Sequence, residues 1–251
     1  TLAQISNAPP PVTLRANRTQ VSAAELLDEL RPRFPDARLG LYSPDAVVLG
    51  RRGNAARDKA FLEGRCSVQD EAAQLVVDLL DPQPGESILD SCAAPGSKTT
   101  AIAERVDSGG YVLALDRHEN RLGLVSRSAR RLGLENIQTL VRDATHPLND
   151  LPQPPGRTPV FDRVPVDAPC SGLGTLRRHP DARWRVQPED LNALRKIQLA
   201  ILRQCTRTLR PKGILVYSTC TLVPEENEDV VTELLEERKD LRRAAAETIP
   251  R

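Results

Sequence analysis

The sequence predicts an α/β fold in which a doubly wound, mostly parallel sheet is accompanied by a small N-terminal α+β domain. Three observations lead to this prediction. The chain has 251 residues, enough for a main domain with a smaller one beside it. From about residue 65 onward, short apolar runs typical of buried strands alternate with longer helical patterns. Before that point the elements are shorter, so a separate small domain is expected.

Composition restricts the possible functions only in part. The 35 Lys and Arg residues nearly balance the 34 Asp and Glu residues, so net charge neither favours nor excludes a polyanionic partner. The five cysteines form no Cys-x-x-Cys pair and have no metal-ligand spacing with histidine, which predicts a reducing, cytoplasmic location and no metal site. No apolar run approaches the roughly 20 residues that span a bilayer, so no membrane association is expected.

The first part of the chain predicts a linker and then the small domain. Residues 1–11 are polar and rich in proline, as linkers are. Residues 12–64 are expected to contain a strand at 12–17, a helix at 23–30 capped by Ser22, and two short strands within 39–49. The basic residues of this segment are Arg15, Arg18, Arg31, Arg33, Arg38, Arg51, Arg52, Arg57 and Lys59. They can form an RNA-binding accessory face or an ordinary solvated surface, and the sequence leaves both open.

Residues 65–251 are expected to form the larger domain. Its first predicted elements are a helix at 67–80 capped by Ser67, a strand at 87–90 and a helix at 98–106. Between the strand and the second helix lies a loop of small residues, Ser91-Cys-Ala-Ala-Pro-Gly-Ser97. Small side chains let a ligand approach the backbone N–H groups of a helix N-terminus. The loop therefore predicts a bed for the polar part of a nucleotide-like cofactor.

The pattern of strand, acid and helix then repeats. Further strands are predicted at 111–116, 137–141, 161–166 and 214–217, and further helices at 119–132 and 188–209. Asp116 ends one strand about 20 residues after the loop, a position that suits a ribose diol, and Asp143 follows the next strand. Repeated βα units predict a right-handed, doubly wound sheet. Because Pro165 cannot donate a ladder hydrogen bond, a local irregularity is expected there.

Two common cofactor motifs are missing from the loop. A dinucleotide site needs GxGxxG, but the loop has the single glycine Gly96, and the first glycine of a P-loop is absent before Ser97-Lys98-Thr99. Acids at the ends of successive strands can instead take ribose hydroxyls, an adenine amino group and an ammonium group. A smaller cofactor with adenosine and amino-acid ends fits better, so S-adenosylmethionine is predicted.

Two small polar turns carry a cysteine just beyond a predicted strand. Asp167 and Cys170 follow the fourth strand in Asp-Ala-Pro-Cys-Ser-Gly, and Cys220 follows the fifth in Ser-Thr-Cys-Thr. Taken alone, Cys170 can be an inert thiol in a tight turn. Because consecutive strands usually neighbour each other, we expect both cysteines to approach the same cleft.

Several motifs are spread along the chain: Ser67-Val-Gln-Asp-Glu-Ala-Ala, Cys92-Ala-Ala-Pro-Gly-Ser-Lys98, Asp116, Asp143, Asp167-Ala-Pro-Cys-Ser-Gly, Arg178-His-Pro-Asp181 with Trp184, Ser218-Thr-Cys-Thr and Pro224-Glu-Glu-Asn227. Together they resemble the NOP/Sun family of RNA cytosine-5 methyltransferases, most closely its bacterial 16S ribosomal RNA methyltransferase B branch, over essentially the whole chain. The resemblance implies a class I, Rossmann-like methyltransferase fold. It also implies methyl transfer from S-adenosylmethionine to C5 of a cytosine in ribosomal RNA.

The resemblance implies a role for each matching residue. Cytosine C5 becomes nucleophilic only after a thiolate has added to C6, so a cysteine is required. By the family pattern Cys220 is that nucleophile, Cys170 assists product release, and Asp167 shares a proton with N3 and contacts the cofactor. The implied cofactor residues are Cys92, Ala93, Ala94, Pro95, Gly96, Ser97 and Lys98 for the methionine end, Asp116 for the ribose and Asp143 for the adenine. Lys98 can also contact the substrate or have only a surface role.

The residues Arg178, His179 and Trp184 are candidates for RNA binding, as a stacking and phosphate-contacting patch or as an ordinary surface. A duplex hides C6, so we expect the target cytosine in a single-stranded or flippable RNA segment. The protein itself is expected to be a monomer.

The chain departs from the family in two ways, and three rival functions stay open. The family loop usually has Gly-Gly-Lys where this chain has Gly96-Ser97-Lys98. Family members continue past the fifth strand, so we expect a domain truncated at its C-terminus with an open sheet edge. A transfer RNA methyltransferase and a non-catalytic RNA-binding module are alternatives. A DNA cytosine methyltransferase is a third, but those enzymes typically use one cysteine after the fourth strand, and Cys220 argues against it.

Overall fold

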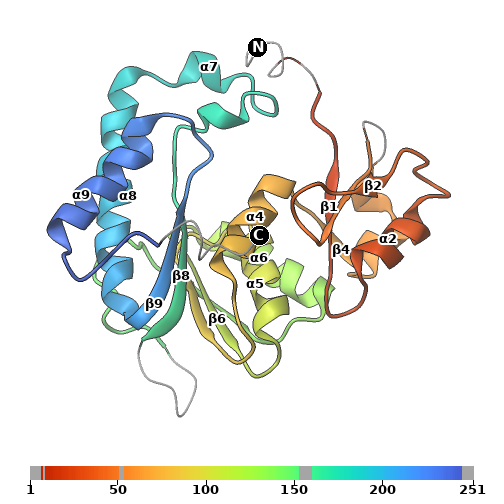
Figure 1. Cartoon of the computed structure of the whole chain (residues 1–251), viewed down its shortest axis with the longest axis horizontal. Coiled ribbons are helices and arrows are strands. Elements are labelled where there is room, and N and C mark those ends of the chain that lie inside the picture. The colour runs from red at the N-terminus through yellow and green to blue at the C-terminus, as the bar shows by residue number, and fades with distance from the viewer. Residues whose placement is uncertain (1–6, 8, 51–53, 153–159, 245–251) are drawn as a thin grey trace.

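The computed structural model describes residues 7, 9–50, 54–152 and 160–244, and it confirms the predicted fold class. A small antiparallel sheet with the strand order β2-β3-β1-β4 accompanies a second sheet with the order β7-β6-β5-β8-β9 (Figure 1). Parts of the predicted linker (1–6 and 8) and of the predicted larger domain (153–159 and 245–251) lie outside the described residues. Within the described ranges, no helix has the length and apolar character needed to cross a membrane.

The small sheet is built from β1 (Thr13–Ala16), β2 (Arg38–Leu39), β3 (Ala46–Val48) and β4 (Cys66–Val68). Helix α2 (Ala23–Leu30) packs on it, and two short helices follow, η1 (Ala55–Arg57) and α3 (Lys59–Leu62). Ser22 caps α2 as predicted: its hydroxyl accepts the Glu25 N–H at 3.2 Å, and the Glu25 carboxylate accepts the Ser22 N–H at 2.9 Å. This reciprocal pair fixes where the helix begins.

The predicted cap for the next helix is wrong. Ser67 lies in β4, which pairs with β1, so the small sheet extends past residue 64, and helix α4 (Glu71–Leu80) begins only after Asp70. The physical reason is a contact with another part of the chain. Strand β1 supplies hydrogen-bond partners for Cys66–Val68, which is too short to show a strand pattern in the sequence. Among the basic residues considered for an RNA-contacting face, Arg15 is buried, while Arg51 and Arg52 lie outside the described residues.

The larger sheet consists of β5 (Ser87–Asp90), β6 (Tyr111–Asp116), β7 (Ile137–Val141), β8 (Phe161–Asp167) and β9 (Leu209–Ser218). Its helices are α5 (Ser97–Val106), α6 (Glu119–Leu132), α7 (Ala182–Arg185), α8 (Pro188–Thr208) and α9 (Glu228–Glu237), with short turns η2 (Leu173–Thr175) and η3 (Pro224–Glu226). Every neighbouring pair of strands is parallel. The strand order reverses between β5 and β8, and doubly wound sheets bind their ligands beyond the carboxyl ends of such strands.

Two details of the sheet differ from expectation. Strand β9 begins at Leu209 and includes residues 210–213, whereas the sequence predicts a helix up to 209 and a strand only from 214. The irregularity expected at Pro165 lies between Phe161 and Arg163, and Pro165 itself pairs with Val216 in register. The Pro165 carbonyl accepts from the Ser91 N–H at 3.4 Å, so the Pro165 nitrogen also faces β5, where it has no hydrogen to donate. The register of β5 with β8 is accordingly the single pair Ile88 and Arg163. In the described ranges β9 is the edge strand, as predicted.

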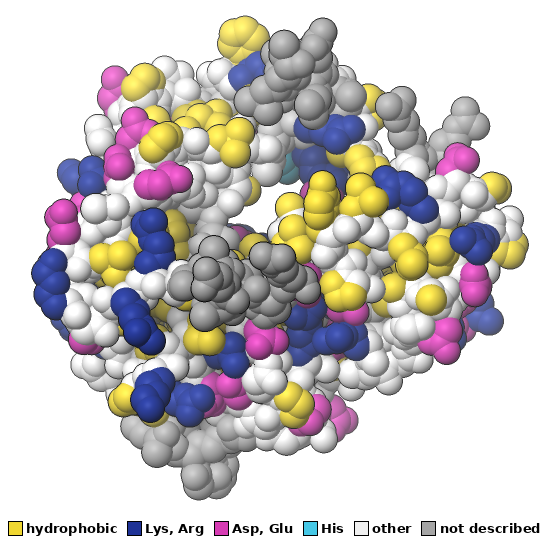
Figure 2. Space-filling model, viewed as in Figure 1, with side chains coloured by type: hydrophobic (Ala, Val, Ile, Leu, Met, Phe, Trp, Pro, Cys, Tyr) yellow, Lys and Arg dark blue, Asp and Glu magenta, His cyan; other side chains and the backbone are white. Residues whose placement is uncertain are grey.

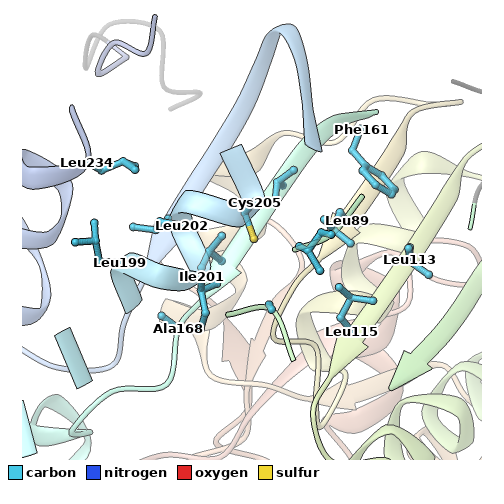
Figure 3. Packing of buried hydrophobic residues seen from close by; sticks show 14 of the residues in the cluster. Leu89, Leu113, Leu115, Phe161, Ala168, Leu199, Ile201, Leu202, Cys205 and Leu234 are labelled. Atoms are coloured by element: carbon cyan, nitrogen blue, oxygen red, sulfur yellow. The ribbon is translucent and has the colours of Figure 1, made fainter. Parts of the chain in front are cut away.

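The main hydrophobic core lies between this sheet and helices α8 and α9 (Figure 3). It includes Leu89, Leu113, Leu115, Phe161, Ala168, Leu199, Ile201, Leu202, Cys205 and Leu234. Close packing holds β5, β8 and α8 in a fixed relation, since an interior at crystal-like density leaves little room for sliding. The turns that leave β5 and β8 therefore carry their side chains to fixed positions.

Candidate active site

Cys170 and Cys220 come together where β8 and β9 end. Asp167 of β8 pairs in register with Ser218 of β9, so the two turns leave the sheet side by side. The Sγ atoms of Cys170 and Cys220 are 3.1 Å apart, and the Cys220 backbone N–H donates to Cys170 Sγ at 3.2 Å. Both thiols thus belong to one site, as the order of the strands predicts.

The two thiols ionise as a pair. The hydrogen bond from the Cys220 thiol lowers the pKa of Cys170 to about 7 against the opposing effect of burial, and the backbone N–H groups of Cys220 and Gly172 also favour the Cys170 thiolate. The same contact with Cys170 raises the pKa of Cys220. Because the two sulfurs are 3.1 Å apart and either can donate to the other, the pair can share one proton, and the lowered pKa of Cys170 favours one thiolate for the pair near neutral pH.

Asp167 and Lys98 form the polar wall beside the cysteines. Asp167 Oδ2 accepts a hydrogen bond from Lys98 Nζ at 2.6 Å, and its Oδ1 accepts one from the Ser218 hydroxyl at 2.9 Å. The Lys98 side chain is only 14% exposed, which excludes the purely surface role that the sequence left open. A carboxylate and an ammonium group therefore lie together at the ends of β8 and β9.

Glu226 ties the two cysteine turns together, and sequence reasoning missed it as a site residue. Its carboxylate is 0% exposed and accepts the Ser171 N–H at 2.9 Å and the Gln198 side-chain amide at 2.8 Å. Gln198, from α8, also donates to the Pro169 carbonyl at 3.0 Å. The sequence does contain a hint of this role, because Glu226 lies in Pro224-Glu-Glu-Asn227 directly after the Cys220 turn. Acids after a proline are typical of a helix start, however, so the segment does not predict a buried hydrogen-bond acceptor.

The small-residue loop between β5 and α5 is held from several sides. Gly96 has φ +105°, and a Cβ there would come within 2.9 Å of Val125 Cα on α6, so glycine is required. Ser97 is the first residue of α5 and does not have a positive φ, which explains why serine is tolerated in place of the family's second glycine. The Thr99 hydroxyl donates to Asp90 Oδ2 at 2.7 Å, and burial raises the pKa of Asp90 to about 6.

The acids predicted for the cofactor follow β6 and β7. Arg121 pairs with Asp116 at 3.6 Å and donates to the Ala94 carbonyl at 2.8 Å, so it connects Asp116 with the small-residue loop. Asp143 lies in a pocket of about 600 Å³, whose other lining residues are Arg117, His118, Val141, Arg142 and His146. Although partial burial opposes it, hydrogen bonding from Thr145 lowers the pKa of Asp143. Among the described residues, no group of His, Cys, Asp or Glu is placed to hold a metal ion.

The predicted RNA-binding residues lie on the segment that leaves the cysteine site. The Gly174 N–H donates to the Cys220 carbonyl at 2.9 Å, and the chain then continues through His179 to α7. Arg178 forms an ion pair with Asp70, while the side chain of Trp184 is 82% exposed. Figure 2 shows the surface hollowed between the side of the molecule with α7 and α8 and the side with α4 and β1. The three candidates thus follow the cysteine site along the chain, and Trp184 is free to meet a ligand from solvent.

Comparison with known proteins identifies related families and sequences. A family model described as 16S rRNA methyltransferase RsmB/F matches residues 77–249, and a model for the ferredoxin-like domain of RsmF/B-like methyltransferases matches residues 1–56. A probable ribosomal RNA small subunit methyltransferase B of Bacillus subtilis is 39% identical over 95% of this chain and 52% of its own length. The Synechocystis protein with the same description is 40% identical over 94% of this chain and 52% of its own length.

Solved structures agree with these matches. A methyltransferase homologue from Pyrococcus horikoshii has a TM-score of 0.78 and 28% identity, and the alignment covers 94% of this chain and 72% of that one. The chain spans about half the length of the curated relatives that it matches.

Proposed function

The chain belongs to the 16S rRNA methyltransferase RsmB/F family, and we propose that it transfers a methyl group from S-adenosylmethionine to C5 of a cytosine in ribosomal RNA. The observation that carries this proposal is the cysteine pair beside Asp167 and Lys98. Attack by cytosine C5 requires prior addition of a thiolate to C6, and the pair supplies a thiolate near neutral pH. One cysteine follows β8, which is one of the two strands between which the order reverses, and the other follows the neighbouring β9, which supports a ligand site at these strand ends.

Cys220 is the proposed nucleophile. Its thiolate forms a bond to C6 of the cytosine, and N3 takes up a proton relayed through Asp167 from the Lys98 ammonium group, 2.6 Å from that carboxylate. C5 of the resulting enamine takes the methyl group. When the Cys220 thiolate attacks, the proton shared by the two sulfurs is on Cys170. Cys170 releases this proton to solvent, and its thiolate then accepts the C5 proton. The Cys220–C6 bond breaks, and N3 returns its proton through Asp167 to Lys98. Each methyl transfer thus releases one proton to solvent and restores one thiol and one thiolate to the pair.

The residues around the small-residue loop fit an adenosine-containing methyl donor. The loop 92–98 offers backbone groups without bulky side chains, and Asp143 borders a pocket of about 600 Å³ that can take an adenine. Asp116 is the proposed ribose partner. When bound, S-adenosylmethionine supplies an electrophilic methyl group, and the loop, Asp116 and Asp143 hold it at the switch point of the sheet.

Replacing Asp143 with alanine tests this placement. We expect S-adenosylmethionine to bind about tenfold more weakly, because one hydrogen bond to a charged group is lost. Isothermal titration calorimetry measures the change. Glu135→Ala is the matched control, since Glu135 is an exposed acid near the opposite end of β7, and it should leave the affinity unchanged. Equal affinity of Asp143→Ala and the parent would remove Asp143 from the cofactor site.

The pH dependence of adduct formation tests the shared thiolate. With a pKa of Cys170 of about 7, adduct formation should rise between about pH 6 and pH 8 and fall in acid as the thiolate is protonated. In Cys170→Ala the Cys220 thiol loses its acceptor and its partner, so the rise should move toward the ordinary thiol pKa of about 8.5. Rapid-quench measurement of protein–RNA adduct against pH gives both profiles. Coincident profiles would contradict sharing of the proton.

RNA is proposed to contact both the small domain (12–64) and the segment with Arg178, His179 and Trp184. An exposed indole beside arginines suits stacking on an unpaired base and contact with its phosphate. The target cytosine must be unpaired or flipped, because the thiolate approaches C6 from above the ring. The methyltransferase domain is assigned to the residues that follow β4 rather than to 65–251, because β4 (Cys66–Val68) pairs with β1 in the small sheet.

Methyl transfer from labelled S-adenosylmethionine to defined RNAs tests the proposal as a whole. A 16S ribosomal RNA fragment should acquire 5-methylcytosine, identified by nucleoside mass spectrometry, while transfer RNA should not. Methylation of transfer RNA alone would establish the alternative substrate. Cofactor binding with no transfer to any RNA, and no adduct, would favour a non-catalytic RNA-binding module.

A further inference from the structure

Arg15 is a buried charge that no step above uses. It lies on β1 of the small domain, its side chain is 2% exposed, and it extends out of that domain toward α5 of the larger one. One terminal nitrogen, Nη1, donates to the Ser97 carbonyl and to Gln69 Oε1, both at 2.9 Å. The other, Nη2, donates to Glu104 Oε1 at 2.7 Å and to the Thr100 hydroxyl at 3.2 Å. The guanidinium group thus bridges the two domains.

Three of these partners lie on the helix that follows the small-residue loop. Ser97 is the first residue of α5, and Thr100 also donates to the Gly96 carbonyl at 2.9 Å. Lys98, the residue next to Ser97, reaches Asp167 in the cysteine site. Arg15 therefore contacts the first turn of α5, which follows the small-residue loop and contains Lys98.

Stability alone does not account for this arrangement. Burial raises the pKa of Glu104 and lowers that of Arg15 in spite of their ion pair, so each charge is held in a poorly solvating environment. Buried ion pairs can often be replaced by apolar side chains without loss of stability. What apolar side chains cannot supply is a planar donor that fixes a carbonyl and a carboxylate at the same time.

We propose that Arg15 is a positioning residue for the methyl donor, and that the small domain is consequently part of the cofactor site. Its hydrogen bond to the Ser97 carbonyl fixes the first turn of α5, and with it the loop 92–98 and the ammonium group of Lys98. This inference rests on the proposed function, since it assumes that the loop holds S-adenosylmethionine.

A second set of contacts holds the small domain independently. Arg131, at the end of α6, donates to the Phe61 and Cys66 carbonyls at 2.6 and 2.9 Å. Asn17 donates to the Gly64 and Leu132 carbonyls at 2.8 and 3.1 Å. These bonds do not involve α5. Arg15 can therefore be replaced while the small domain stays docked, and Arg131 offers a matched control from the same interface.

The test compares Arg15→Met, Arg15→Lys, Arg131→Met and the double variant Arg15→Met/Glu104→Leu. Calorimetric titration with S-adenosylmethionine gives the affinity, and thermal unfolding gives the midpoint. We expect Arg15→Met to bind about tenfold more weakly, as for loss of a charged hydrogen bond. Arg15→Lys keeps the positive charge but loses the two planar terminal nitrogens, so its affinity for S-adenosylmethionine should lie between those of Arg15→Met and the parent. Arg131→Met should lower the midpoint and leave the affinity unchanged.

The double variant separates positioning from stability. Its two substitutions replace both buried charges with apolar side chains and should restore the unfolding midpoint, while the Ser97 carbonyl still lacks its donor and the affinity stays weak. Recovery of both quantities, or an Arg15→Met affinity equal to that of the parent, would show that Arg15 serves stability only and would overturn the inference. A parent protein that binds RNA but not S-adenosylmethionine would instead overturn the proposed function on which the inference depends.

Discussion

Replacing Cys220 with alanine is expected to abolish methyl transfer, by at least about 10⁴-fold, and to prevent any covalent protein–RNA adduct. Without the thiolate no bond to C6 can form, and C5 then lacks the electron density to take a methyl group. Labelled S-adenosylmethionine measures the transfer, and a denaturing gel with a cytosine-containing ribosomal RNA fragment reveals the adduct. Cofactor affinity should be unchanged, because the cysteine turn follows β9 and the small-residue loop follows β5.

Cys170→Ala completes this experiment because it affects a later step. With the proton acceptor removed, the adduct should form through Cys220 and persist on the gel instead of resolving. Cys66→Ala is the control for the loss of a thiol as such, because Cys66 is buried in the small domain and burial raises its pKa to about 12. An adduct from Cys220→Ala and none from Cys170→Ala would exchange the two roles and favour a mechanism of the DNA methyltransferase type.

Much of the larger sheet could be predicted because local signals and tertiary structure agree there. The strands at 87–90, 111–116 and 137–141 have the predicted bounds, since each is an apolar run that stops at a turn or an acid. Gly133 ends α6 with φ +74°, the left-handed conformation that a C-terminal cap requires. The convergence of the cysteines also followed from the order of the strands.

What escaped prediction depends on contacts between distant residues. Glu226 and Ser171 are 55 positions apart, and Arg15 and Glu104 are 89 apart. A charged side chain in a sequence is most simply interpreted as exposed, because burial of a charge is costly unless partners are supplied. Those partners come from other elements of the fold, so neither residue could be recognised until the strands and helices were placed. Both residues hold backbone near the site: Glu226 accepts from Ser171 in the Cys170 turn, and Arg15 donates to Ser97 and Glu104 of α5.

Asp167→Asn is expected to reduce the rate of methyl transfer by roughly 10²- to 10⁴-fold while the RNA affinity changes little. An amide cannot relay a proton to N3, and it leaves the Lys98 ammonium group without its charged partner. The negative charge that builds up on the ring when Cys220 adds to C6 is then not neutralised, so the adduct should also form slowly. Single-turnover kinetics with the RNA fragment measure both steps.

Ser218→Ala provides the matched control, because it removes one hydrogen bond to the same carboxylate and leaves both the charge and Lys98 in place. Its rate should fall by no more than about tenfold, in line with the loss of one hydrogen bond to a carboxylate that keeps Lys98 as its partner. If Asp167→Asn were no slower than Ser218→Ala, the carboxylate would only orient the β8 and β9 turns, and the proton for N3 would have to come directly from Lys98. In that case Lys98→Met should reduce the rate of methyl transfer more than Asp167→Asn does. The general acid of the reaction would then be Lys98 of α5 rather than Asp167 of β8.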